Sequence, residues 1–136
     1  MTEKWSRWEP ITNLARKYYI DSVSEDRTGF KIVLSSSENE NQKIKIVFKN
    51  SVEAYKKTDE TLRHRIVCEL SDNYGDEFYV NWTFFKVTNS NYLAWLSEQS
   101  YTISDTRHLT HFTILAVDSI LDIVNVEEPQ IEHISE

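Results

Sequence analysis

The chain has 136 residues, of which 40% are hydrophobic and 12% aromatic, and its formal net charge is −7. The length and the hydrophobic content suit one folded domain over residues 1–136 and exclude an extended disordered chain. The negative charge disfavours nucleic acid as a partner, because binding to phosphates depends on lysine and arginine side chains.

Other counts narrow the class of protein further. No apolar run approaches the roughly 20 residues that a membrane span requires, and the N-terminus lacks the pattern of a signal peptide. The single cysteine, Cys68, has no partner for an internal disulfide, which fits a reducing compartment. Two glycines are too few for a loop that cradles phosphate. We therefore expect a cytoplasmic protein with no cofactor and no membrane partner.

The first half of the chain predicts an antiparallel meander. Trp5 and Trp8 near the N-terminus indicate that residues 1–15 dock on the body of the protein. Strands are expected over residues 17–23, 30–34 and 44–48, where apolar and polar side chains alternate, with a turn at residues 25–29. Residues 51–55 are then expected to form a short helical turn.

A helix is expected to begin at residue 58, with acidic side chains in its first turn. Leu62, Ile66 and Leu70 define its buried stripe, and it ends at residues 73–75, where Gly75 suits the left-handed position after a helix.

The densest apolar stretch, residues 77–87, predicts a central strand. Phe78, Val80, Trp82 and Phe84 alternate with more polar residues and are expected to be largely buried. Residues 88–90 are good helix N-caps, and a short amphipathic helix should follow, with Trp95 packed against the strand.

Two more strands are expected at residues 108–116 and 120–126, and residues 127–136 form an edge extension or a tail. The sum is an α+β protein: a mostly antiparallel β-sheet, folded as a sandwich or a strongly curled sheet, with about two short helices.

No constellation in the sequence predicts catalysis or a metal site. His64 and Cys68 share a helix face, but Cys68 is expected to be a buried, inert thiol beside the apolar stripe. His108 and His111 are three apart in a strand and should point to opposite faces. Paired carboxylates are plentiful, yet each pair lies at a turn or a helix start, where acids are common. We therefore predict that the protein is not an enzyme.

Acidic residues concentrate between residues 59 and 77, around one tyrosine at the expected end of the helix. These residues either cap and solvate a helix, or form a surface that complements a basic partner. On the second interpretation, the candidate partner-binding residues are Asp59, Glu60, Asp72, Tyr74, Asp76 and Glu77.

Four segments resemble a known family: WEPITNLARKYYI (8–20), NSVEAYKKTDE (50–60), NWTFFKVTNSNYLAWLSEQS (81–100) and ILDIVNVEEP (120–129). In these segments the chain is similar to the WapI (YxxG-like) immunity proteins, encoded beside the wall-associated contact toxin WapA of bacilli. The segments carry strand, turn and core patterns and no chemical motif, so the resemblance assigns no residue a role. It implies a cytoplasmic protein that binds and neutralises the toxin's C-terminal nuclease domain, a tRNA-cleaving domain in that system.

Two other classes remain open at the level of sequence. One is a small enzyme that uses His64, Cys68 or an acid pair. The other is a non-catalytic β-rich adaptor or ligand-binding domain, which would share the composition and the fold. A long secreted repeat protein encoded immediately upstream would favour the immunity protein over the adaptor.

Overall fold

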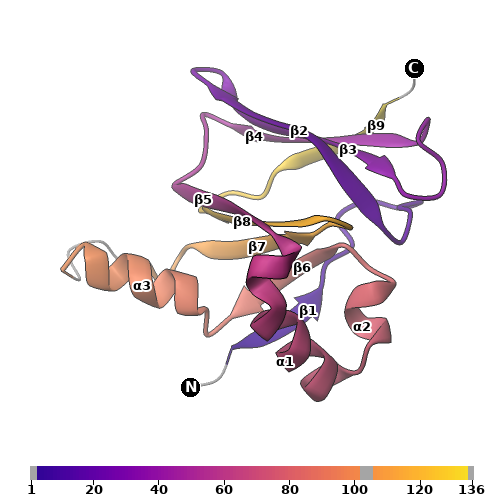
Figure 1. Ribbon diagram of the computed structural model, residues 1–136. Helices are drawn as coiled ribbons and strands as arrows, with labels where there is room; N and C mark the ends of the chain where they lie inside the picture. Colours follow the sequence, from indigo (N-terminus) through magenta and orange to yellow (C-terminus); the bar gives the residue numbers. More distant parts are fainter. Residues whose placement is uncertain (1–2, 102–105, 135–136) are drawn as a thin grey trace.

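The computed structural model describes residues 3–101 and 106–134. Within these residues, nine strands form two antiparallel sheets that face each other, so the expected sandwich is confirmed (Figure 1). The five-stranded sheet has the order β1-β6-β7-β8-β5: β1 (Lys4–Arg7), β6 (Phe84–Thr88), β7 (Thr110–Leu115), β8 (Ser119–Asn125) and β5 (Ala54–Asp59). The four-stranded sheet has the order β2-β3-β4-β9: β2 (Tyr18–Asp26), β3 (Gly29–Ser36), β4 (Lys43–Lys49) and β9 (Gln130–Ile134).

The predicted meander is the four-stranded sheet, and its inner face forms half of the main core. In β3 and β4, every second side chain is fully buried against the other sheet. Gly29 begins β3 with a φ of 141°, and a Cβ atom there would lie 2.3 Å from the carbonyl oxygen of Phe48. Only glycine therefore fits this hairpin. The C-terminal extension is β9, an edge strand paired with β4, and residues 135–136 lie outside the described part.

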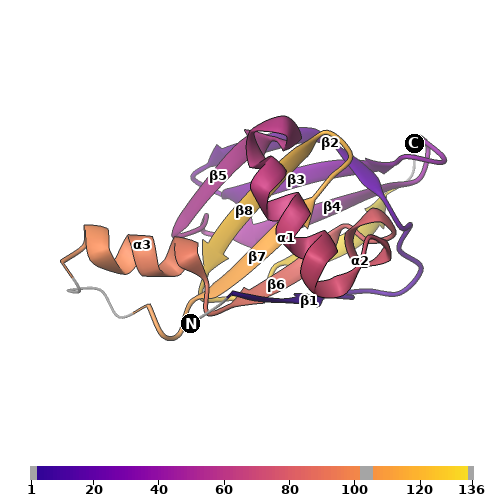
Figure 2. The ribbon, with the colours of Figure 1, turned by 60° about the horizontal axis from the view of Figure 1, so that its bottom comes forward.

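The outer face of the five-stranded sheet carries the helices, which gives the molecule a third layer (Figures 1 and 2). A 3₁₀ helix, η1 (Glu60–Arg63), leads directly into α1 (His64–Tyr74), and α2 (Glu77–Val80) follows. Leu70 of α1 packs with Trp5, Phe85 and Leu115 in a second, smaller core cluster. Trp5 and Trp8 are both buried, so the N-terminal segment docks as expected.

The predicted central strand at residues 77–87 is only half right. β6 begins at Phe84, whereas Phe78 and Val80 lie in α2, and Val80 is 52% exposed. The α2 turn places Phe78 between Tyr74 and Phe85, with ring centroids 4.3 and 5.1 Å away. The alternation at residues 78–82 therefore reflects a helical turn that packs one aromatic side chain on the sheet. Residues 51–55 were also assigned wrongly, because β5 begins at Ala54.

The last helix, α3 (Asn91–Gln99), begins where the N-cap signal predicted. The Ser90 hydroxyl accepts the backbone N–H of Leu93, and Tyr92 is buried. Beyond that turn, α3 projects from the sandwich (Figures 1 and 2). Trp95 is 53% exposed and stacks only on Tyr92, so its predicted packing against the residue 78–84 stretch is wrong.

Candidate functional site

The acidic segment begins at the end of β5, where Asp59 caps η1. The Asp59 carboxylate accepts the backbone N–H and the hydroxyl of Thr61, at 2.9 and 2.7 Å. Hydrogen bonds from the hydroxyl and then from the backbone of Thr61 lower the pKa of Asp59. Asp59 is therefore a capping residue that also contributes a charge to the surface, and Glu60 follows it as the first residue of η1.

Tyr74, at the other end of α1, is held by the fold on two sides. Its hydroxyl accepts the backbone N–H of Trp5 at 3.0 Å, and its ring stacks on Phe78. Gly75 then ends the helix with a φ of 86°. Tyr74 remains 39% exposed, so one part of its ring is available at the surface while the rest fixes α1 and α2 to β1.

The six candidate residues fall into two groups at opposite ends of η1 and α1. Asp59 and Glu60 lie at the start, and about 20 Å of helix separates them from Asp72. The second group is compact: Asp72 and Tyr74 occupy the last turns of α1, Asp76 accepts a hydrogen bond from Ser71, and Glu77 begins α2. The structure thus brings together four of the six candidates: Asp72, Tyr74, Asp76 and Glu77.

The stripe predicted on this helix is only partly buried. Leu70 is buried and Ile66 half-buried, but Leu62 is 77% exposed in η1. Cys68 is exposed, which contradicts the prediction of a buried thiol. The reason is angular: at 100° per residue, position 68 lies about 200° from both Ile66 and Leu70. Its Sγ lies 3.4 Å from His64 Nε2, so these two residues do share a helix face as predicted.

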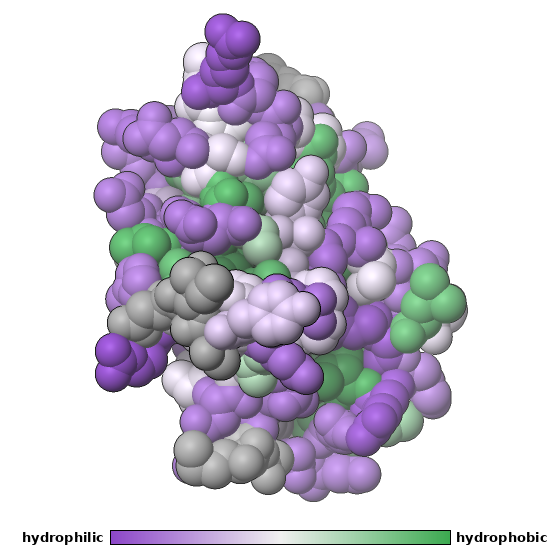
Figure 3. Space-filling model, turned by 90° about the vertical axis from the view of Figure 1, so that its left-hand side faces the viewer, coloured by the Kyte–Doolittle hydropathy of each residue, from purple (hydrophilic) through white to green (hydrophobic). Residues whose placement is uncertain are grey.

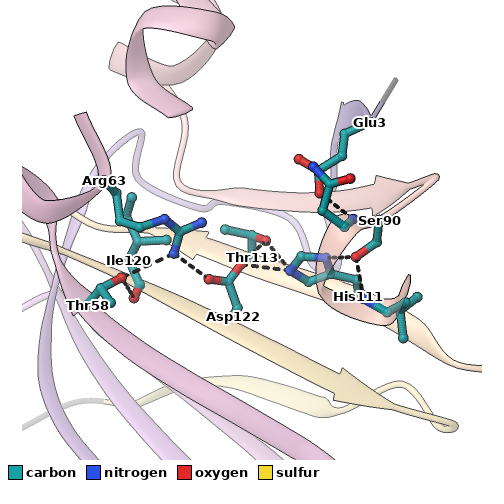
Figure 4. A network of polar contacts seen from close by, with 10 residues as sticks. Glu3, Thr58, Arg63, Ser90, His111, Thr113, Ile120 and Asp122 are labelled. Atoms are coloured by element: carbon teal, nitrogen blue, oxygen red, sulfur yellow. Dashed lines mark hydrogen bonds and ion pairs between the residues drawn. The ribbon is translucent and has the colours of Figure 1, made fainter. Parts of the chain in front are cut away.

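A buried polar network crosses the outer face of the five-stranded sheet between α1 and α3 (Figure 4). Asp122 of β8 is fully buried and accepts hydrogen bonds from Arg63 Nη1 at 2.8 Å, His111 Nε2 at 2.7 Å and Thr113 Oγ1 at 3.0 Å. On the other side of the ring, His111 Nδ1 lies 2.7 Å from the Ser90 hydroxyl, within hydrogen-bonding distance.

The electrostatics of this network favour an ionised Asp122. Burial by itself raises the pKa of the carboxyl group, but the hydrogen bond and charge of His111, followed by the charge and hydrogen bond of Arg63, outweigh burial and lower the pKa to about 2. Arg63 is the first residue before α1, so the ion pair fastens the acidic helix to the centre of the sheet.

Ser90, His111 and Asp122 follow one another in the order of a nucleophile, a base and an acid, but their burial distinguishes them from a catalytic triad. The three side chains are 6% exposed or less. Ser90 Oγ is also occupied by the N-cap hydrogen bond to α3. Within the described residues, no buried side-chain polar atom lacks a partner. The arrangement is built to hold β7, β8, α1 and α3 together, and it offers no open position to a substrate.

A second buried cation lies under α2. Lys17 Nζ donates to the backbone carbonyls of Tyr79, Trp82 and Leu115, at 2.8, 2.9 and 2.6 Å. Burial lowers the pKa of Lys17 to about 8, although the nearby carboxylate of Glu60 acts in the opposite direction. Lys17 thus ties α2 and the segment between α2 and β6 to the end of β7.

Sequence reasoning missed Lys17, Arg63 and Asp122, and one signal for the last of these was present. Asp122 interrupts the apolar run of β8, where all seven residues are buried. An acid in a strand covered on both faces requires a buried cation or donor. Nothing in the local sequence identifies that cation as Arg63.

Comparisons with known proteins leave the site to be interpreted from its geometry. The sequence matches no family model, and no curated protein or solved structure matches it either. Over residues 3–101 and 106–134, no helix has the length and apolar character to cross a membrane. Nor does this part of the chain gather three or more His, Cys, Asp or Glu side chains in a way that suits a metal ion.

Proposed function

We propose that this protein is a cytoplasmic immunity protein that binds a basic nuclease toxin domain and neutralises it without catalysis. The observation that carries the proposal is the charge of the η1–α1–α2 segment, residues 59–77. This segment contains six carboxylates and two arginines, so it carries −4 of the net charge of −7. Both arginines are already paired, Arg63 with Asp122 and Arg65 with Glu69.

The compact group at the junction of α1 and α2 supplies the centre of the proposed interface. Asp72, Asp76 and Glu77 are exposed and lie within three residues of Tyr74 along the chain, and the Tyr74 side chain is 39% exposed. A tyrosine that is already immobilised loses little conformational entropy on binding, and tyrosine is enriched among interface hot spots. The carboxylates of this group resemble the phosphates that a nuclease cleft binds, and they accelerate the encounter with a cationic surface.

The face on the side where α3 projects supports a polar rather than a purely hydrophobic mode of binding. Seen from the side on which α3 projects, hydrophobic residues reach the surface as separate patches among hydrophilic ones (Figure 3). The resemblance of four segments to WapI-type immunity proteins is the second support, because it indicates a tRNA-cleaving nuclease as the class of partner.

The test is inhibition in solution. The probe is the C-terminal nuclease domain of a WapA-type contact toxin, the partner that the resemblance implies, with tRNA as its substrate. We expect tRNA cleavage to stop at one equivalent of this protein, and to continue in the presence of an equal amount of an acidic protein of unrelated fold. Full cleavage at a ten-fold excess of this protein would contradict the proposal and favour the adaptor or ligand-binding alternative.

A further inference from the structure

A groove of about 240 Å³ lies between α1, α2 and the end of β7. Its walls are mainly apolar: Val67 comes from α1, Val80 from α2, and Leu115 to Val117 from β7 and the turn after it. Small-molecule sites commonly measure about 300–1,000 Å³, so this groove suits a single side chain better than a cofactor. Val80, 52% exposed, leaves its outer wall accessible.

Two charged residues also line the groove, and their hydrogen-bonding capacities differ. The three N–H groups of Lys17 are all donated to backbone carbonyls, so this ammonium has none left for a ligand. The carboxylate of Glu60 is half-buried and makes no hydrogen bond or ion pair within the described part of the chain. The charge of this carboxylate acts on the Lys17 ammonium, but its oxygens keep their hydrogen-bonding capacity beside an apolar wall.

We infer that the groove is the binding site for an arginine side chain of the partner, whose guanidinium pairs with Glu60. This inference rests on the proposed function, because it names the partner group that the acidic face receives. The aliphatic stem of an arginine lies against Val67, Val80 and Val117, and its planar head meets the carboxylate at the rim.

Arginine fits the groove better than lysine for two reasons. Guanidinium is more weakly hydrated than ammonium, so it is transferred more readily to an apolar wall. Its flat face also stacks on an aromatic ring, and Tyr79 contributes such a ring to the lining. Arginine is, moreover, enriched among the residues that dominate interface energies.

The experiment uses a small probe and does not need the toxin. The full chain, labelled with ¹⁵N, is titrated with N-acetyl-arginine methylamide and, separately, with the uncharged analogue N-acetyl-citrulline methylamide. We expect amide shifts at Val67, Val80 and Val117 that saturate with the arginine probe, and about five-fold weaker binding of the citrulline probe, as for a partly exposed ion pair.

Two variants test whether the carboxylate of Glu60 is the group that pairs with the arginine probe. Glu60→Gln should weaken the arginine probe to the level of the citrulline probe, whereas Glu132→Gln, at an exposed acid of β9 in the other sheet, should leave its affinity unchanged. Equal affinities of the two probes for the wild type, or shifts that map to another surface, would overturn the inference. If the nuclease is inhibited but the arginine probe does not bind, the arginine site is refuted and the proposed function stands. Arginine binding without nuclease inhibition would refute the proposed function and leave the groove as a cation-accepting site.

Discussion

The buried pair of Arg63 and Asp122 gives the sharpest test of how the acidic helix is held on the sheet. In Asp122→Asn, Arg63 keeps its charge but loses its counter-ion, and an amide N–H₂ group replaces one of the oxygens that accept from Arg63, His111 and Thr113. Breaking a buried ion pair on one side typically costs about 3–5 kcal/mol. A domain of this size is stable by about 5–15 kcal/mol, so the change removes a large share of the total.

Urea unfolding followed by tryptophan fluorescence measures this loss. With a slope of about 2 kcal/mol per molar urea, the midpoint should fall by roughly 2 M. Asp118→Asn is the matched control, because Asp118 is exposed, and its midpoint should not move. A double-mutant cycle with Arg63→Gln should give a favourable coupling of about 1–3 kcal/mol. A midpoint for Asp122→Asn equal to that of the Asp118 control would refute the reasoning.

Two further predictions concern the buried charges. The pKa of Asp122 is about 2 in the folded state against 3.8 as its ordinary value, so the folded state binds fewer protons between these values and loses stability as the pH falls through them. This shift is worth about 2.5 kcal/mol over the whole titration, and about 1.8 kcal/mol of it falls between pH 4 and pH 2, so the wild type should lose about 1.8 kcal/mol more stability than Asp122→Asn over that range; equal slopes would contradict the assignment. Lys17→Met leaves the carbonyls of residues 79, 82 and 115 without a donor and should cost about 2–4 kcal/mol in urea unfolding. Lys31→Met, on β3 of the other sheet, is the control, and an equal effect of the two changes would be the contrary result.

The strands of the meander were predictable because one face of each is buried and the other is wet. β4 shows this alternation over its whole length and β3 shows it from Phe30 to Leu34, and Gly29 marks the hairpin between β2 and β3. The start of α3 was equally predictable, since a serine N-cap acts within four residues of itself. Features that depend only on near neighbours were thus available from the sequence.

The errors arose where distant residues decide. Phe78 and Trp82 alternate as in a strand, but Gly75 and the stacking of Phe78 on Tyr74 produce a helical turn there instead. Trp95 is apolar at helical spacing, yet α3 extends past the sheet that would have covered it. The network around Asp122 joins residues 63, 90, 111, 113 and 122, and no local pattern encodes which of them meet.

The residue types of the candidate site were predictable from the sequence, but their arrangement on the surface was not. The sequence displays the acids of residues 59–77, but their division into two groups follows from the straight course of η1 and α1 between them. Likewise, Tyr74 was predicted as an anchor because it lies among the acids at the expected end of the helix, whereas its hydrogen bond is to the backbone of Trp5 in β1, 69 residues away.

Our central proposal is that the acids at the junction of α1 and α2 bind a basic nuclease. Surface plasmon resonance with the toxin's nuclease domain, for the wild type and for the triple variant Asp72→Asn, Asp76→Asn, Glu77→Gln, tests it most directly. The matched control is Glu38→Gln, Glu40→Gln, Glu132→Gln, which removes the same charge from exposed positions on or beside the four-stranded sheet. We predict that the first variant loses about ten-fold or more in association rate at low salt, and the control much less. Equal association rates and affinities for the two variants would contradict the claim.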